Sequence, residues 1–375
     1  MVQAPIPGEF TLLTDDEVRD RISRAKRALG DRLVVLGHHY QRDEIIEHAD
    51  FRGDSYKLAQ HARDMGDAEF IVFCGVHFMA ESADILTPEH QKVILPNLAA
   101  GCSMADMANI FQVKRCWSQL TEGADPIARG EDIVPVTYIN SAANLKAFVG
   151  EHGGTVCTST NAPAALRWAL ERGQKVLFFP DQHLGRNTAS AMGFDTESDM
   201  CVWDPFKPYG GQSVETLKRC RFILWKGHCS VHKRFSVAQV EKARADFPGV
   251  RVLVHPECEM AVVRASDMYG STEFILHAIE DSPSGSQWAV GTEINLVNRI
   301  ARENPDKTVF CLDPQICPCS TMYRIHPSFL CWVLEELVHG RIVNQVKVDG
   351  DVAQWALVAL ERMLEVGKVA SSHVD

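Results

Sequence analysis

The stretch LVVLGHHY, residues 33–40, decides the fold class, because it joins an apolar, β-branched run to a polar end. Four consecutive apolar residues indicate a strand that is buried on both faces, as in parallel sheets. Similar runs, most of them followed by a stretch of helical periodicity, begin near residues 70, 92, 133, 155, 175, 221, 250, 288 and 308. Strands and helices that alternate in this way predict an α/β fold with parallel sheets and right-handed crossovers.

The expected strands form three groups of about three, which open near residues 33, 133 and 221. Since 375 residues exceed what one hydrophobic core usually supports, this spacing predicts three similar small α/β domains. We predict a helical extension over 1–30, a first domain over 31–118 that residues 320–375 complete, a second over 119–215 and a third over 216–319.

The composition limits the classes of function. A formal net charge of −11 argues against non-specific binding of nucleic acid or anionic membranes, since either normally needs a basic patch. The first residues lack the basic and apolar regions of a signal peptide, and no apolar run approaches the roughly 18 residues of a membrane span. We therefore expect a cytoplasmic protein whose twelve cysteines are reduced: buried hydrophobes, metal ligands or nucleophiles.

Three cysteines lie in loops that follow expected strand ends: Cys102 in AAGCSMAD, Cys229 in KGHCSVH and Cys319 in CPCSTM. Ligands of α/β sheets bind beyond the carboxyl ends of the strands, so three such thiolates could hold a metal centre and leave one position open. Cysteines in apolar runs or on helical patterns are expected to be inert buried thiols. These are Cys74, Cys116, Cys157, Cys220 and Cys331.

The motifs, taken in order, resemble the quinolinate synthase family in its longer bacterial form. They are GHHYQ, GDSYKLA, AAGCSMAD, VTYINS, TST, PDQHLG, WKGHCSVH, VHPE, the GST of residues 270–272 and CPCSTM, and they run from about residue 30 to residue 340. The resemblance implies three homologous α/β domains with pseudo-threefold symmetry around a central active site. It also implies a transferase that condenses iminoaspartate with dihydroxyacetone phosphate to give quinolinate, phosphate and two waters, in de novo NAD biosynthesis.

The same resemblance implies a 4Fe-4S cluster held by three cysteines, whose open iron acts as a Lewis acid in dehydration. Carried over residue by residue, the ligands are Cys102, Cys229 and Cys319. Cys317 competes with Cys319, because the spacing here departs from the C-x-x-C-x-x-C of some relatives. The expected partner, in transient contact, is an L-aspartate oxidase or dehydrogenase that supplies iminoaspartate.

The resemblance also assigns the side chains that meet the substrates. Tyr40, Tyr138, His232 and Glu257 would be catalytic, with the Glu257 carboxylate moving protons. The substrate-binding residues would be His38, Ser55, Tyr138, Asn140, Ser159, His255, Glu257 and Thr272.

The residues alone leave plainer interpretations open. Asp54 or Ser55 could cap a helix, Tyr138 and Asn140 could belong to the core, and the HPE sequence could be solvated surface. The long stretch 193–220 looks irregular, and a lid there would protect an imine from hydrolysis.

Two other classes of function would use similar residues. One is a zinc-dependent α/β hydrolase, although zinc sites favour local pairs such as C-x₂-C or H-E-x-x-H, neither of which occurs here. The other is a non-catalytic sensor of small acids, which would not require three loop thiols.

Overall fold

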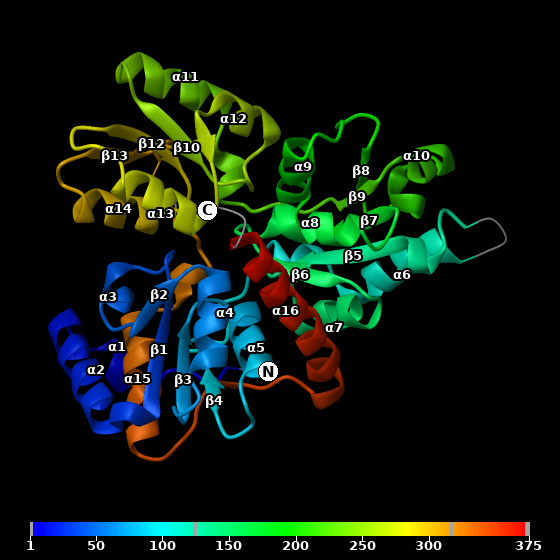
Figure 1. The fold of residues 1–375 in the computed structure, drawn as a ribbon. Coiled ribbons are helices and arrows are strands. Elements are labelled where there is room, and N and C mark those ends of the chain that lie inside the picture. The colour runs from blue at the N-terminus through cyan, green and yellow to red at the C-terminus, as the bar shows by residue number, and fades with distance from the viewer. Residues whose placement is uncertain (1–2, 123–125, 316–317, 372–375) are drawn as a thin grey trace. The chain divides into compact units, whose positions relative to one another are not determined.

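The structure is a computed structural model that describes residues 3–122, 126–315 and 318–371 (Figure 1). It confirms the α/β class, since helices alternate along the chain with strands that form three sheets, and nearly all strand pairs are parallel. The chain divides into two compact units. The first comprises Met1–Cys102, Glu293–Arg299 and Gln315–Asp349, and the second comprises Ser103–Thr292, Ile300–Pro314 and Gly350–Asp375.

The first unit contains a five-stranded sheet in the order β14-β4-β3-β1-β2. Its strands are β1 (Leu33–His38), β2 (Phe51–Gly53), β3 (Phe70–Cys74), β4 (Lys92–Ile94) and β14 (Gln345–Val346). Only the pair of β14 and β4 is antiparallel. Helices α3 (Asp43–Ile46), α4 (Ser55–Asp64) and α5 (His77–Leu86) connect the strands. As the sequence predicts, LVVLGH is a buried strand between two parallel neighbours.

Three helices complete this unit: α1 (Gly8–Thr11), α2 (Asp15–Leu29) and α15 (Pro327–Val338). A capping box between Thr14 and Glu17 starts α2. Helix α2 is amphipathic, with its buried residues spaced three or four apart, and it packs against α15. The Arg21 guanidinium donates to the Glu335 carboxylate at 2.6 Å and joins the two helices.

The second unit contains two parallel sheets, of which one has the order β6-β5-β7-β9-β8. Its strands are β5 (Ile133–Tyr138), β6 (Thr155–Cys157), β7 (Lys175–Phe179), β8 (Met200–Trp203) and β9 (Phe222–Trp225). The helices are α6 (Ile110–Thr121), α7 (Ala143–Glu151), α8 (Ala162–Leu170), α9 (Gln182–Ala191) and α10 (Val214–Arg219).

The other sheet of this unit has the order β11-β10-β12-β13. Its strands are β10 (Arg251–Val254), β11 (Met268–Tyr269), β12 (Gln287–Gly291) and β13 (Thr308–Cys311). Its helices are α11 (Val237–Asp246), α12 (Met260–Ala265) and α13 (Thr272–Glu280). Helix α14 (Ile294–Glu303) is divided, since its residues up to Arg299 belong to the first unit and the rest to the second. Valines from β10 and α12 and the side chains of Phe235 and Leu312 form its core.

The placement of three segments differs from the sequence-based grouping. Strand β9, expected to open the third group, pairs with β7 and β8 of the second sheet. The stretch 193–220 is not irregular throughout, because it contains β8 and α10. Four-residue strands such as β8 are too short to show a clear period, which explains why the sequence concealed it.

The last helix, α16 (Gly350–Ser371), lies against α7, α8 and β6 of the second unit (Figure 1). The sequence-based boundaries placed residues 320–375 with the first domain instead. A glycine permits this packing, because a Cβ at Gly150 would lie 2.0 Å from the carbonyl oxygen of Trp355. The boundaries of the three domains and the pseudo-threefold symmetry stay predictions. Within the described residues, no helix is both long and apolar enough to span a membrane.

Candidate active site

The predicted site residues all lie at or just after the carboxyl ends of strands, at helix starts or in the loops that connect them. In the first unit they are His38, Tyr40, Ser55, Cys102 and Cys319. In the second unit they are Tyr138, Asn140, Ser159, Cys229, His232, His255, Glu257 and Thr272. This is where parallel α/β sheets place ligands, so the topology supports a functional reading of these motifs.

The second unit brings four of these residues into one buried network around Glu257. The Tyr138 hydroxyl donates to Glu257 Oε1 at 2.7 Å, and His232 Nδ1 lies 2.8 Å from Glu257 Oε2. The His255 ring stacks on the His232 ring with centroids 4.4 Å apart. All four side chains are at least 95% buried. The surface interpretation of the HPE motif is therefore wrong.

The protons in this network can be assigned by chemistry. An ionised carboxylate only accepts hydrogen bonds, so His232 Nδ1 carries the proton that faces Glu257. The other ring nitrogen, Nε2, lies 3.2 Å from the hydroxyl of Thr292, which the sequence did not identify. Tyr138, Glu257, His232 and Thr292 thus form a continuous chain of hydrogen bonds.

The electrostatics of the network favour an ionised Glu257. Burial opposes its charge, but the interactions with His232 and His255 and the hydrogen bonds from His232 and Tyr138 outweigh burial, so its pKa lies below the ordinary value. Burial, followed by the charge of His232, lowers the pKa of His255 to about 3, so this ring is neutral near pH 7. The arrangement therefore presents a desolvated carboxylate beside a phenol and an imidazole, as proton transfer requires.

Asp181, in the PDQHLG motif, is a buried carboxyl group to which the sequence assigned no role. Its Oδ1 accepts hydrogen bonds from the backbone N–H groups of His183 and Leu184 at 2.6 and 3.1 Å and caps α9. In the described part of the chain, its Oδ2 has no hydrogen-bond partner. Burial and then the charge of Glu257 raise the pKa of Asp181 well above its ordinary value. We infer a protonated carboxyl group at this position.

Replacing Asp181 by Asn is expected to leave the free energy of unfolding within about 1 kcal/mol of the original at low pH, where the carboxyl group is protonated in both the folded and the unfolded protein, because an amide resembles a protonated carboxyl. Asp181→Ala should cost about 1–3 kcal/mol, since two buried N–H groups lose their acceptor. A raised folded pKa contributes stability at low pH that is lost as pH rises through that pKa. The free energy of unfolding of Asp181→Asn, measured with denaturant, should therefore increase relative to that of the original protein as pH rises. If the free energy of unfolding of the variant instead increased relative to the original as pH fell, Asp181 would be charged in the folded protein.

Two predicted hydroxyl residues begin helices directly after a capping residue. Asp54 caps α4 by accepting from the Lys57 N–H at 2.9 Å, and Ser55 follows it. Ser271 caps α13 by accepting from the Phe274 N–H at 3.3 Å, and Thr272 follows it. The cap of α4 is therefore Asp54, and each hydroxyl residue lies at a helix N-terminus, where anions are favoured.

Asn140 and Ser159 follow β5 and β6, respectively. In the residues that the structure describes, the buried Oδ1 of Asn140 has no hydrogen-bond partner. A buried polar atom of this kind is normally satisfied by water or by a ligand. Both residues therefore stay candidates for substrate binding.

In the first unit, the GHHYQ motif forms a tight turn at the end of β1. His38 Nδ1 accepts from the Tyr40 backbone N–H at 3.1 Å, and the two rings meet edge to face with centroids 4.9 Å apart. His38 is 4% exposed and His39 is 6% exposed. The turn therefore fixes the orientation of His38 relative to Tyr40.

The three predicted cluster ligands differ from most of the other cysteines in their exposure. Cys102, Cys229 and Cys319 are half-buried, whereas the five thiols expected to be inert are buried. Burial raises the pKa of Cys74 and of Cys331 to about 12, as expected of unreactive thiols. Cys317, the competing ligand, lies outside the described residues.

One group of donor atoms in the described residues could hold a metal ion. Single donor atoms of Cys229, His232 and Glu257 all lie within 4.8 Å of one another. The sequence predicted all three as site residues, although only Cys229 as a metal ligand.

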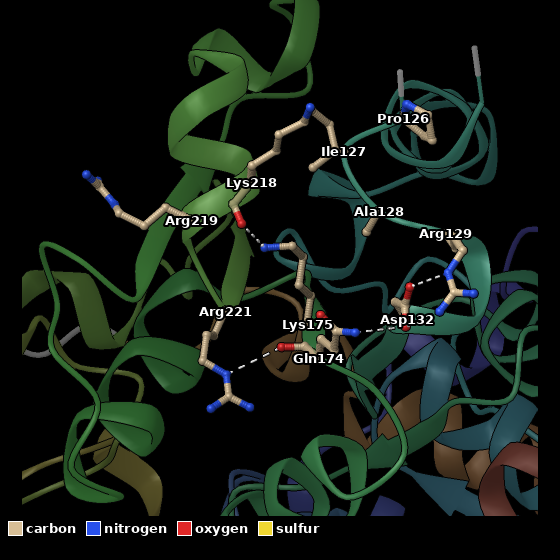
Figure 2. A pocket seen from close by; sticks show the side chains of 10 residues that line it. All are labelled: Pro126, Ile127, Ala128, Arg129, Asp132, Gln174, Lys175, Lys218, Arg219 and Arg221. Carbon is tan, nitrogen blue, oxygen red and sulfur yellow. Dashed lines mark hydrogen bonds and ion pairs between the residues drawn. The ribbon is translucent and has the colours of Figure 1, made fainter. Parts of the chain in front are cut away.

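A separate hollow of about 680 Å³ lies at the amino ends of β5, β7 and β9 (Figure 2). It is basic, but its cations already bond to protein groups. Lys175 Nζ donates to the carbonyls of Lys218 and Cys220 at 2.7 and 2.6 Å, and Arg129 pairs with Asp132 at 2.9 Å. Tyr138 lies at the other end of β5, so the hollow and the candidate site are at opposite edges of this sheet. None of the residues that line the hollow is a predicted site residue.

Together, the parallel sheets and the buried acid–base network at their strand ends define the class of an α/β enzyme. Residues 20–365 match the family described as Quinolinate synthetase A protein. The quinolinate synthase of Corynebacterium glutamicum is 60% identical over 97% of this chain and 91% of its own length. Those of Nocardioides sp. and Streptomyces coelicolor are each 55% identical, over 98% and 96% of this chain and 94% and 90% of their own lengths. The chain belongs to the quinolinate synthetase A family.

Proposed function

We propose that the protein is a quinolinate synthase that condenses iminoaspartate with dihydroxyacetone phosphate to give quinolinate, phosphate and two waters. Family membership and 50–60% identity to quinolinate synthases support this activity. The single structural observation that carries it is the buried Glu257 carboxylate, which accepts from Tyr138 and His232 beside the Cys229 thiol. The place of the reaction is NAD biosynthesis, in the cytoplasm.

We propose that Cys102, Cys229 and Cys319 hold a 4Fe-4S cluster. The donor set suits it, because half-exposed thiolates in strand-end loops are the ligands that iron–sulfur clusters prefer. When bound, the cluster supplies an open iron that acts as a Lewis acid towards a substrate oxygen. A zinc site made of Cys229, His232 and Glu257 is less well supported, since one ring nitrogen of His232 and one oxygen of Glu257 already bond to one another.

The substrates are anions, and the predicted binding groups suit anions. Ser55 and Thr272 lie at helix starts, where backbone N–H groups and the helix dipole favour carboxylates and phosphate. Asn140 offers a polar side chain with an unsatisfied buried oxygen, and Ser159 offers a hydroxyl. His38 and Tyr40, fixed by their turn, would bind and orient the remaining polar atoms of the substrates.

Glu257 is proposed to accept a proton from carbon or nitrogen during condensation and tautomerisation, and to return it when water leaves. Tyr138 and His232 would stabilise the carboxylate and take part in this exchange, because both donate to it directly. The overall reaction balances without an oxidant or reductant, so the residues need to move only protons. His255, neutral and stacked on His232, would hold that ring in place.

The proposal can be tested by anaerobic purification, counting of iron and sulfide, and an assay for quinolinate from dihydroxyacetone phosphate and freshly generated iminoaspartate. Brown protein that forms quinolinate is the expected result. Colourless protein that contains zinc would favour the hydrolase, and binding of a small acid without turnover would favour the sensor. Since iminoaspartate hydrolyses readily, we also propose that an L-aspartate oxidase or dehydrogenase supplies it in transient contact.

A further inference from the structure

Glu293, in the first unit, is a completely buried carboxylate with four hydrogen-bond donors around it. Its Oε2 accepts from the backbone N–H groups of Asn295 and Leu296 at 2.8 and 3.4 Å, which caps α14. Its Oε1 accepts from the Asn295 side chain at 3.0 Å and from the backbone N–H of Cys319 at 3.1 Å. One side chain therefore starts a helix and holds the backbone of a predicted cluster ligand.

The length of this side chain is informative. Helix caps are normally Ser, Thr, Asp or Asn, and this chain uses Asp54, Asn109, Ser213 and Ser271 in that way. A glutamate is one methylene longer than the cap alone needs. At Glu293 the extra length brings the second oxygen to Cys319, a contact that an ordinary cap would not make.

The segment Glu293–Arg299 also holds the GHHYQ turn. Arg299 is 3% exposed and donates to the carbonyl oxygens of His39 and Gln41 at 2.8 and 2.5 Å, while its Nε pairs with Asp43 at 2.8 Å. Asn295 Nδ2 donates to the Tyr40 carbonyl at 3.3 Å. Every carbonyl from His39 to Gln41 is thus bonded to the segment Glu293–Arg299.

We propose that Glu293 and Arg299 are positioning residues, which fix the Cys319 loop and the His38–Tyr40 turn to one short segment of helix. The inference rests on the proposed function, because it concerns a cluster ligand and a substrate-binding turn. Neither residue is assigned a contact with substrate or cluster. Partners that orient a metal ligand typically change metal affinity 10–100-fold when they are replaced.

Glu293→Asp tests the first half of the proposal, because aspartate is a good cap but is too short to reach Cys319. We expect an unchanged circular dichroism spectrum and loss of iron to a chelator, under anaerobic conditions, about 10–100-fold faster than from the original protein. Glu303→Asp makes the same change at the exposed end of the same helix and should lose iron at the original rate. If Glu293→Asp does not fold, Glu293→Gln replaces it, because glutamine has a single accepting oxygen and cannot both cap α14 and accept from Cys319, so it should also lose iron faster.

Hydrogen exchange of the apoprotein separates this inference from the proposed function. Amides around Cys319 should exchange faster in Glu293→Asp than in the original protein or in Glu303→Asp, whether or not a cluster binds. If the original protein binds no iron, the proposed function fails, but hydrogen exchange still tests whether Glu293 holds the Cys319 loop. Equal exchange and equal iron loss in a folded Glu293→Asp would overturn the inference for Glu293.

Arg299→Lys tests the second half, because lysine keeps the charge but cannot bond to both carbonyls and Asp43 at once. We expect the KM for substrate to rise about tenfold, with kcat less affected and iron content unchanged, since only the substrate-binding turn loosens. Arg302→Lys, the same exchange at an exposed position in the last turn of α14, should change neither constant. An unchanged KM would overturn the role of Arg299.

Discussion

Replacing Glu257 by Gln is expected to lower kcat by about 10²–10⁴-fold, the usual contribution of a positioned acid–base group. The amide has almost the same shape but cannot accept a proton. It also turns one of the two accepting oxygens into a donor, which then faces Tyr138 or His232. Quinolinate formation under anaerobic conditions measures the effect, with iron content determined on the same sample.

Glu259→Gln is the matched control for this prediction. Glu259 lies two residues further along the same loop, is exposed and begins α12 without a side-chain cap. Its variant should retain the original kcat. If Glu257→Gln retained kcat within a few-fold at full iron content, the buried carboxylate would be structural and proton transfer would belong to another group.

The sequence predicted the fold class well because strands buried on both faces are continuous apolar runs. The same property explains why β9 was assigned to the wrong group of strands, since a continuous apolar run does not indicate which sheet the strand joins. Likewise, the amphipathic pattern of α16 predicts a helix but not its partner. Helix α16 packs on α7 through the close approach of its backbone to Gly150, and the sequence of neither helix predicts this contact.

The residues of the candidate site were likewise predicted only in part, because motifs identify some of them and only the fold identifies the others. Tyr138, His232 and Glu257 were predicted from motifs, and the structure places them in one hydrogen-bonded network. Asp181 and Glu293 were missed, because in sequence each resembles an ordinary polar residue before a helix. Burial distinguishes both of them, together with an unpartnered second oxygen in Asp181, within the described residues, and a bond to the distant Cys319 in Glu293. A Glu where a shorter cap is usual was the one available signal.

Serine at Cys229 is expected to abolish both the brown colour and quinolinate formation. A serine hydroxyl is a poor, protonated ligand for iron compared with a thiolate, and a cluster with three protein ligands would keep only two. The same loss is expected for Cys102→Ser and Cys319→Ser. Iron and sulfide content, visible absorption and the anaerobic assay together measure the outcome.

Cys311→Ser is the matched control, because Cys311 is half-buried like the predicted ligands but lies within β13 and has no assigned role in the cluster. It should keep its iron and its activity. The decisive comparison is between Cys317→Ser and Cys319→Ser, since the sequence leaves both thiols as candidates for the third ligand. If Cys317→Ser loses iron while Cys319→Ser keeps it, Cys317 is the third ligand. The bond from Glu293 to the Cys319 backbone would then position the loop as a whole rather than the ligand itself.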